Sequence, residues 1–220
     1  MREFERKRQP HLQARDTAYS VTFLLHDAVT GPQLESLRRE LDEILRDIDA
    51  DPLDRKAFRK AEARTRATRQ LESLLASQRD QAHALADPAA ARVVAEYFQK
   101  FDGELLRLFA YSVMSNHAHV LFDLSPQLDD VVDSGTIEWP IDRLVGRLKG
   151  GSAFAANKAL RRNGSLWMKG YYDRYIRSGR HFDAEYWYIL MNPVKAGLVV
   201  DYGDHAATWG RPGVTGRFRS

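Results

Sequence analysis

The chain has 220 residues, of which 44% are hydrophobic and 29% charged, with a formal net charge of +3 and no cysteine. This composition fits one large domain, or a core domain with an inserted segment, and it excludes a disulfide framework and a thiolate metal site. No stretch approaches the roughly 20 apolar residues of a membrane helix. Because the basic N-terminus has no apolar stretch behind it, we expect no secretory signal and a cytoplasmic protein.

The first half of the chain predicts one strand followed by helices. β-Branched and aromatic residues indicate a strand over 18–25, and Gly31-Pro32 ends it and opens a helix over about 33–49. After Asp51-Pro52, a second charged helical stretch runs over about 53–85. We interpret this helical hairpin as a structural insertion without chemistry of its own. Asp87-Pro88 then caps a helix over about 89–100.

The second half predicts a hairpin, a helix, a strand and a last helix. Strands over 105–114 and 117–124 are joined by a tight turn at Ser115-Asn116. A polar loop follows, and Pro140 begins a helix that runs to about Arg162. A strand over 167–177 and a helix over 182–191 come next, and we expect an irregular tail from Asp201.

This order predicts an α+β protein with a ferredoxin-like antiparallel sheet, helices on one face and a long helical insertion after the first strand. We expect a single domain over 16–210, with the insertion at about 33–85. The ends, 1–15 and 211–220, are expected to be flexible tails. We find neither an internal repeat nor a low-complexity linker.

The segment 143–180 is strongly basic, although the whole chain is only mildly so. Its one acidic residue is Asp173, and aromatic residues lie between the cations. Such a segment fits either a phosphate backbone with exposed bases or a solvated basic face. On the first interpretation, candidate DNA contacts are Arg143, Arg147, Lys149, Lys158, Arg161, Arg162, Tyr172, Arg174 and Arg177. Lys149 could equally be a solvated lysine.

Two histidines one residue apart interrupt the apolar strand after the turn. In a strand, residues i and i+2 point to the same face, so His117 and His119 converge while Ala118 points away. Two imidazoles in a sheet interior both need partners, and neutral ring nitrogens can share a divalent metal. The pair therefore predicts half of a metal site, with a further ligand from elsewhere.

The last helix offers that further ligand. Glu185, Tyr188 and Asn192 fall at i, i+3 and i+7 and share one helical face. The carboxamide oxygen of Asn192 suits Mg²⁺ or Mn²⁺, which prefer oxygen, and Tyr188 would lie beside the ion. Alternatively, Tyr188 belongs to an aromatic packing cluster. Tyr186 is the rival tyrosine, but two residues along a helix place it on roughly the opposite side from Tyr188.

Three ordered blocks resemble the single-tyrosine transposases that carry a His-hydrophobic-His (HUH) signature. They are Val113–Leu121 (VMSNHAHVL), Leu166–Arg177 (LWMKGYYDRYIR) and Tyr188–Val199 (YILMNPVKAGLV). The long form is most similar to the REP-associated tyrosine transposases, and the resemblance covers most of 16–210. The chain departs from the family at Ser115, where proline is frequent, and at Ala118, where a bulkier aliphatic residue is common.

The resemblance implies a function. His117, His119 and Asn192 would hold Mg²⁺ or Mn²⁺, and Tyr188 would attack a phosphate of single-stranded DNA that carries a REP-like hairpin. A 5′-phosphotyrosine and a free 3′-OH would result. The protein would be a monomer or a homodimer with no membrane partner. Two alternatives stay open, namely a domesticated relative that binds hairpin DNA without cutting it, and a metal hydrolase in which water attacks.

Overall fold

The computed structural model describes residues 18–51, 55–77, 83–129, 141–176 and 178–215. The chain forms two compact units. The hairpin unit comprises Asp27–Ala82 and contains most of the predicted insertion, and the core unit comprises Met1–His26 with His83–Ser220. The predicted N-terminal tail lies outside the described residues. No helix among the described residues is long and apolar enough to span a membrane.

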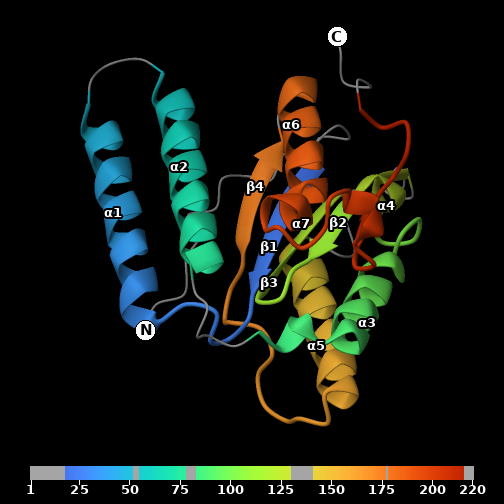
Figure 1. The fold of residues 1–220 in the computed structure, drawn as a ribbon. Coiled ribbons are helices and arrows are strands. Elements are labelled where there is room, and N and C mark those ends of the chain that lie inside the picture. The colour runs from blue at the N-terminus through green and yellow to red at the C-terminus, as the bar shows by residue number, and fades with distance from the viewer. Residues whose placement is uncertain (1–17, 52–54, 78–82, 130–140, 177, 216–220) are drawn as a thin grey trace. The chain divides into compact units, whose positions relative to one another are not determined.

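The core unit is built on a five-stranded antiparallel sheet in the order β4-β1-β3-β2-β5 (Figure 1). The strands are β1 (Ala18–Leu24), β2 (Arg107–Val113), β3 (His117–Asp123), β4 (Tyr172–Ile176) and β5 (Thr208–Gly210). The first four follow the 4-1-3-2 order of a ferredoxin-like sheet. The predicted α+β class with an antiparallel sheet is confirmed.

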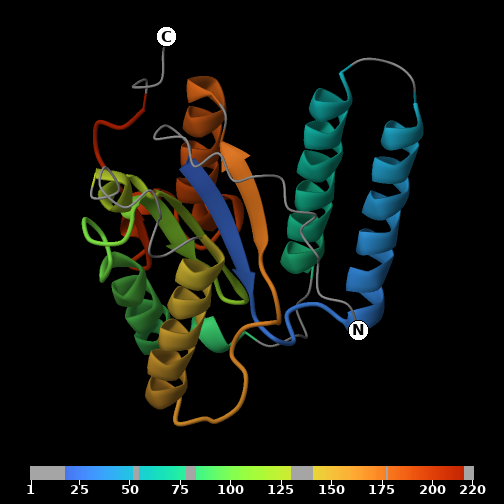
Figure 2. The same ribbon diagram turned by 180° about the vertical axis from the view of Figure 1, so that it is seen from behind.

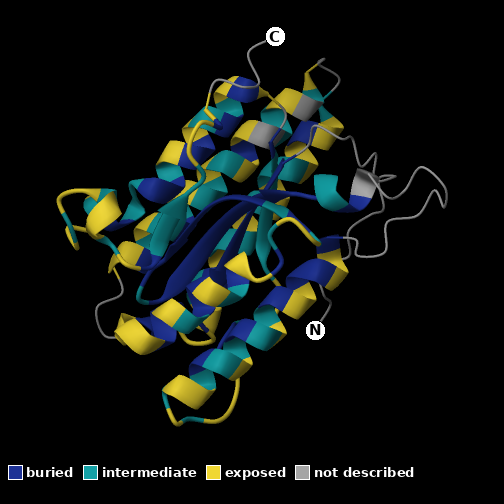
Figure 3. Cartoon of the chain, turned by 90° about the vertical axis from the view of Figure 1, so that its right-hand side faces the viewer, coloured by how far each residue is buried: buried dark blue, intermediate teal, exposed yellow. Residues whose placement is uncertain are grey.

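The central strands are buried on both faces, which Figure 3 shows as dark blue. Along β1, Phe23 packs on Phe98 while Thr22 points to the opposite face beside His119. We call the side with Thr22 and His119 the histidine face and the other side the aromatic face. Both faces of these strands are covered, and the buried polar side chains Ser20, Thr22, His117 and His119 alternate with apolar ones and lie on the histidine face.

Helices α3 (Pro88–Gln99) and α5 (Ile141–Ala159) pack together on the aromatic face. Phe98 of α3 contacts Phe23, and Trp167, which also packs on Phe23, donates its indole N–H to Ser152 of α5 at 3.0 Å. A Cβ on Gly151 would fall 1.8 Å from the Tyr97 ring, so glycine at this position lets α3 and α5 approach closely.

Helix α6 (Gly179–Leu190) covers the histidine face, so the prediction of helices on one face only is wrong (Figures 1 and 2). Phe182, Ile189 and Leu190 of α6 form a core with Ala110 and Leu121 of the sheet. Ser178 caps the helix by accepting a hydrogen bond from the His181 N–H at 3.2 Å. The apolar face of α6 thus packs on the apolar part of the histidine face, which includes Leu121 and Ala110.

A short second helix, α7 (Asn192–Lys195), follows directly after α6. Pro193 has no N–H to donate to the preceding turn, and its ring crowds the carbonyl four residues back, so α6 cannot continue regularly through it. Met191 retains helical dihedral angles between the two helices. Asn192 consequently begins a new turn one turn beyond Tyr188.

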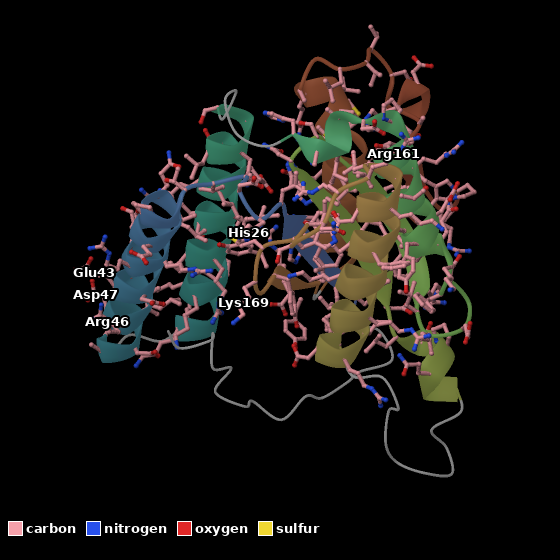
Figure 4. The ribbon with its side chains drawn as sticks, turned by 90° about the horizontal axis from the view of Figure 1, so that it is seen from below. His26, Glu43, Arg46, Asp47, Arg161 and Lys169 are labelled. Carbon is pink, nitrogen blue, oxygen red and sulfur yellow. The ribbon has the colours of Figure 1, made fainter. Side chains whose placement is uncertain are left out.

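The hairpin unit consists of α1 (Gly31–Ala50) and α2 (Lys56–Ser77), which pack against each other. Thr30 and Gln33 form a capping box at the start of α1. Glu43, Arg46 and Asp47 point away from α2 (Figure 4). The second helix, predicted over about 53–85, is shorter in the structure. The described part of α2 ends at Ser77, and Ala84–Ala86 is a 3₁₀ turn.

Several other boundaries differ from the sequence prediction. β4 is confined to five residues, and Trp167 forms only an isolated bridge to Leu25. A short helix, α4 (Ser125–Asp129), stands at the start of the predicted acidic loop, of which residues 130–140 lie outside the described residues. The expected irregular tail contains β5, and beyond it Arg211 donates to the carbonyl of Leu108 while Val214 is buried in the α6 core.

Candidate metal and tyrosine centre

The two histidines lie side by side on β3, with ring centroids 4.8 Å apart. His117 is the first residue of the strand and pairs with Leu24, and His119 pairs with Thr22. Their side chains are almost fully buried, at 7% and 1% exposure. The spacing of two residues therefore places both rings on the histidine face, as the sequence predicts.

Each histidine hydrogen-bonds through one ring nitrogen, and the other nitrogen has no partner within the described part of the chain. Nδ1 of His117 lies 2.7 Å from Oδ1 of Asn116, and Nδ1 of His119 lies 2.9 Å from the Thr22 hydroxyl. An amide oxygen only accepts, so Nδ1 of His117 carries the proton and its Nε2 carries a lone pair. Neither Nε2 has a hydrogen-bond partner among the described residues, although both atoms are buried.

Burial keeps both rings neutral at ordinary pH. It lowers the pKa of His117 to about 4. The pKa of His119 is lowered well below its usual value, first by burial and then by the nearby His117 and the positive charge of Arg174. A neutral imidazole whose Nδ1 is hydrogen-bonded and whose Nε2 is unpartnered is the usual form of a metal ligand. The residues present therefore fit a divalent metal.

Tyr188 lies against this pair. Its ring meets the ring of His119 at an interplanar angle of 82°, with centroids 5.7 Å apart. Helix α6 carries Tyr188 in its last turn, half-buried at the edge of the apolar core. The structure thus brings together the tyrosine and one histidine of the predicted site.

Asn192 begins α7 and is oriented by the turn before it. Its side-chain Nδ2 donates to the backbone carbonyl of Tyr188 at 3.4 Å. This bond leaves the amide oxygen as the atom that could accept a cation. Within the described ranges, no third His, Cys, Asp or Glu joins the two histidines. Among the described residues, this amide is therefore the group that we take as the candidate for a further protein ligand.

The structure separates Tyr186 from the site. Its hydroxyl donates to the carbonyl of Arg211 at 2.9 Å, and its ring is buried in the α6 core. Burial, with a contribution from Tyr202, raises the pKa of Tyr186. A buried phenol that is hydrogen-bonded to a backbone carbonyl on the apolar side of α6 is unsuited to attack a phosphate at the histidines.

Glu185, the third member of the predicted helical face, is held in an ion pair. Its carboxylate accepts from Arg174 of β4 at 2.9 Å and from the hydroxyl of Ser20 of β1 at 2.6 Å. Both side chains of the pair are mostly buried, at 22% and 10% exposure. Arg174 was a predicted DNA contact, and the structure shows it as part of the bond between α6 and the sheet.

The other predicted DNA contacts divide between the two faces. Tyr172 pairs with Thr22 in the sheet and so faces the same side as His119. Helix α5 carries three exposed cations on the aromatic side of the sheet, and Arg161 follows its C-terminal end (Figure 4). The three cations of α5 are Arg143, Arg147 and Lys158. These cations do not share the histidine face.

Two of the predicted DNA contacts, Lys149 and Arg162, donate hydrogen bonds to backbone carbonyls. Lys149 donates to the carbonyl of Met168 at 2.6 Å and to that of Gly170, and burial lowers its pKa to about 8. The Lys149 side chain therefore binds the backbone of the loop at Met168 and Gly170 instead of extending into solvent. Arg162 donates to the carbonyl of Ser165 at 3.2 Å. Arg177 lies outside the described residues.

Sequence reasoning missed three residues around the histidines. Thr22 and Asn116 orient the two rings, and the ammonium of Lys195 lies 4.4 Å from the centroid of the Tyr188 ring. Asn116 could have been noticed as the amide that directly precedes His117. Nothing in the sequence marks Thr22, because its place opposite His119 depends on strand register.

Comparison with known proteins finds similarity to a solved structure but to no family model or curated protein. No protein-family model matches the sequence, and no curated protein matches it. Among solved structures, a REP-associated tyrosine transposase bound to a REP hairpin is similar, with a TM-score of 0.40 and 14% identical residues. The match covers 90% of this chain and 78% of that chain. A likeness at this level does not show a shared family.

Proposed function

We propose that the protein is a transposase-type nickase and strand transferase that acts on single-stranded DNA bearing a hairpin. The observation that carries this proposal is the pair of buried, unpartnered Nε2 atoms with the Tyr188 ring against His119. The three sequence blocks that resemble HUH single-tyrosine transposases supply the substrate class.

His117, His119 and Asn192 would hold a divalent cation, Mg²⁺ or Mn²⁺. When bound there, such an ion would polarise a phosphate and offset its negative charge. The protein's own part is to keep both imidazoles neutral and to orient them through Asn116 and Thr22. Asn192 is oriented in turn by the Tyr188 carbonyl.

Tyr188 would act as the nucleophile. A bond forms between its phenolic oxygen and the phosphorus, and the bond from phosphorus to the 3′ oxygen breaks. The phenolic proton passes to solvent, and the departing 3′ oxygen takes up a proton to become a hydroxyl. The 5′-phosphotyrosine keeps the energy of the phosphodiester, so attack by another 3′-OH joins strands and restores the phenol.

The DNA surface would consist of two parts. Tyr172, on the histidine face, could contact the single strand near the scissile phosphate, because an aromatic ring accepts any base. The exposed cations Arg143, Arg147, Lys158 and Arg161 would contact phosphates elsewhere on the substrate. We leave Lys149 and Arg174 out of this surface, since both hold parts of the fold together.

A denaturing gel with end-labelled hairpin oligonucleotides tests the proposal. A 3′ label should move with the protein as an adduct in Mg²⁺ or Mn²⁺, and a 5′ label should appear on a shortened strand whose 3′-OH a polymerase can extend. EDTA and Tyr188→Phe should each abolish both products, with DNA binding by Tyr188→Phe within about twofold. Tyr186→Phe is the matched control and should retain the adduct.

The same gel separates the alternatives. Cleavage without an adduct, by the wild type and by Tyr188→Phe alike, would indicate water as the nucleophile and refute the tyrosine mechanism. Tight hairpin binding with no cleavage in any metal would show a binding protein instead of a transferase. An adduct that survives Tyr188→Phe would place the nucleophile elsewhere.

A further inference from the structure

Lys195 reaches back over the tyrosine from the neighbouring helix. It is the last residue of α7, three residues after Asn192, and its side chain is exposed. Its Nζ lies 4.4 Å from the centroid of the Tyr188 ring. The same ring meets His119 of β3. The Tyr188 ring is therefore contacted by the ring of His119 and by the ammonium of Lys195, which come from different elements.

We propose that Lys195 is a positioning residue for the reaction of Tyr188, holding the phenol ring in place and presenting positive charge to the scissile phosphate. The proposal rests on the proposed function. Lys195 follows Tyr188 by seven residues and Asn192 by three, so helical spacing places it on the same side as both.

The contact between the Lys195 ammonium and the Tyr188 ring favours one orientation of the ring without locking it. An ammonium within about 6 Å of an aromatic centroid is attracted to the ring. That attraction is small against the stability of a domain but large enough to favour one ring orientation about twofold to fivefold. Correct placement of a nucleophile relative to phosphorus is a major source of rate acceleration.

The charge of Lys195 also complements the substrate. A phosphodiester carries one negative charge, and more charge accumulates on its oxygens as the phenol attacks. Groups already in place to receive developing charge lower the barrier more than they strengthen binding. Because Lys195 is exposed, it can approach a DNA phosphate while remaining close to the ring. Its removal should therefore slow adduct formation more than it weakens binding.

The first test compares Lys195→Met, which removes the charge at similar length, with Lys195→Arg, which keeps it. Single-turnover adduct formation at saturating DNA should slow about tenfold or more in Lys195→Met and remain within about threefold of wild type in Lys195→Arg. The dissociation constant and the thermal midpoint should change little. A merely structural lysine would lower the midpoint without changing the rate at saturation.

The chain offers a matched control on the other face of the sheet. Lys100 also lies over a tyrosine, with Nζ 5.5 Å from the centroid of the Tyr97 ring. Lys100→Met should leave the saturated rate unchanged. Equal rates for wild type and Lys195→Met, or equal losses in Lys195→Met and Lys100→Met, would overturn the proposal.

A second readout does not depend on activity. Reductive methylation with ¹³C keeps the lysine charge, and the Lys195 methyl signal should be shifted upfield by the Tyr188 ring and return to the usual position in Tyr188→Leu. An identical signal in both proteins would refute the ring contact. If the wild-type signal is shifted but the protein forms no adduct, the proposed transesterification is refuted. The proposed role of Lys195 in that reaction is then refuted as well, although its contact with the Tyr188 ring is confirmed.

Discussion

The centre depends on how each histidine divides its two ring nitrogens. Asn116 and Thr22 occupy the Nδ1 atoms, and the Nε2 atoms are buried without a partner among the described residues. Leaving two buried polar atoms unsatisfied costs free energy unless a ligand completes them. The arrangement is therefore explained better by a site for a cation than by packing alone.

At the residue scale, the buried histidines predict a pH dependence. An unfolded chain binds a proton at each histidine near pH 6.5, whereas folded His117 does so only near pH 4. Between these values the unfolded state binds more protons, so stability falls as the pH falls from 6.5 to 4. The slope is at most about 1.4 kcal/mol per pH unit for each histidine.

Urea unfolding of the metal-free protein in EDTA measures this dependence. His117→Gln should flatten the slope between pH 6.5 and 4 relative to wild type. His26→Gln, which replaces the exposed histidine labelled in Figure 4, serves as the matched control and should leave it unchanged. A wild-type slope no steeper than that of His117→Gln would contradict the buried neutral state.

The sequence predicts the shared face of the histidines but not their surroundings. The alternation of a strand is enough to place His117 and His119 together, and helical spacing is enough to separate Tyr188 from Tyr186. Thr22 could not be found in this way, because its place opposite His119 depends on strand register, which is set by packing between distant segments. Lys195 shares the helical face of Tyr188 by spacing, but spacing alone does not show that its ammonium lies over the ring.

At the scale of elements, the ion pair of Arg174 and Glu185 fixes α6 to the sheet one turn before Tyr188. Ser20 adds a second bond to the same carboxylate, so β1, β4 and α6 meet at this point. A mostly buried pair adds little net stability, but removal of one partner leaves the other charge uncompensated. The pair therefore makes the position of α6 specific.

Arg174→Met should destabilise the protein by roughly 2–3 kcal/mol, because the Glu185 carboxylate stays buried without its cation. The double variant Arg174→Met/Glu185→Leu should recover most of this loss, as two apolar side chains replace the pair. Chemical denaturation of the four proteins of this cycle gives the coupling energy. Additive effects of the two substitutions would contradict a bond between α6 and β4.

The position of α6 on the histidine face could not be predicted from the sequence. Its apolar face is evident from the sequence, but the choice between the two faces of the sheet is not, because both faces of β1 and β3 are buried. β5 is missed for a different reason. Three residues are too few for a strand pattern, and Thr208–Gly210 pairs only because β2 offers an open edge.

At the scale of the whole molecule, the core unit holds close together the two points between which the hairpin unit is inserted. The Leu25 N–H donates to the carbonyl of Asn116 at 2.9 Å, and the Leu85 N–H donates to that of Ser115 at 3.0 Å. The chain thus leaves and re-enters the core unit at adjacent points beside His117. An insertion whose ends meet in this way can be exchanged for a short connection.

We expect that replacing 27–82 by a glycine-serine linker of about six residues leaves the core unit folded. Its thermal unfolding should remain cooperative, and it should still form the DNA adduct. The same linker in place of α3 is the matched control and should abolish folding, because Val94 and Phe98 are fully buried. Loss of cooperative unfolding on removal of 27–82 would show that the core unit depends on the hairpin unit.

The most direct measurement is the location of the covalent bond in the DNA adduct. After nuclease treatment and tryptic digestion, the peptide His181–Lys195 should carry the nucleotide, and fragmentation should place it on Tyr188. This peptide also contains Tyr186, so a single spectrum compares the tyrosine beside His119 with the tyrosine buried in the α6 core. A nucleotide on Tyr186, on a tyrosine outside this peptide, or on none would contradict the proposed centre.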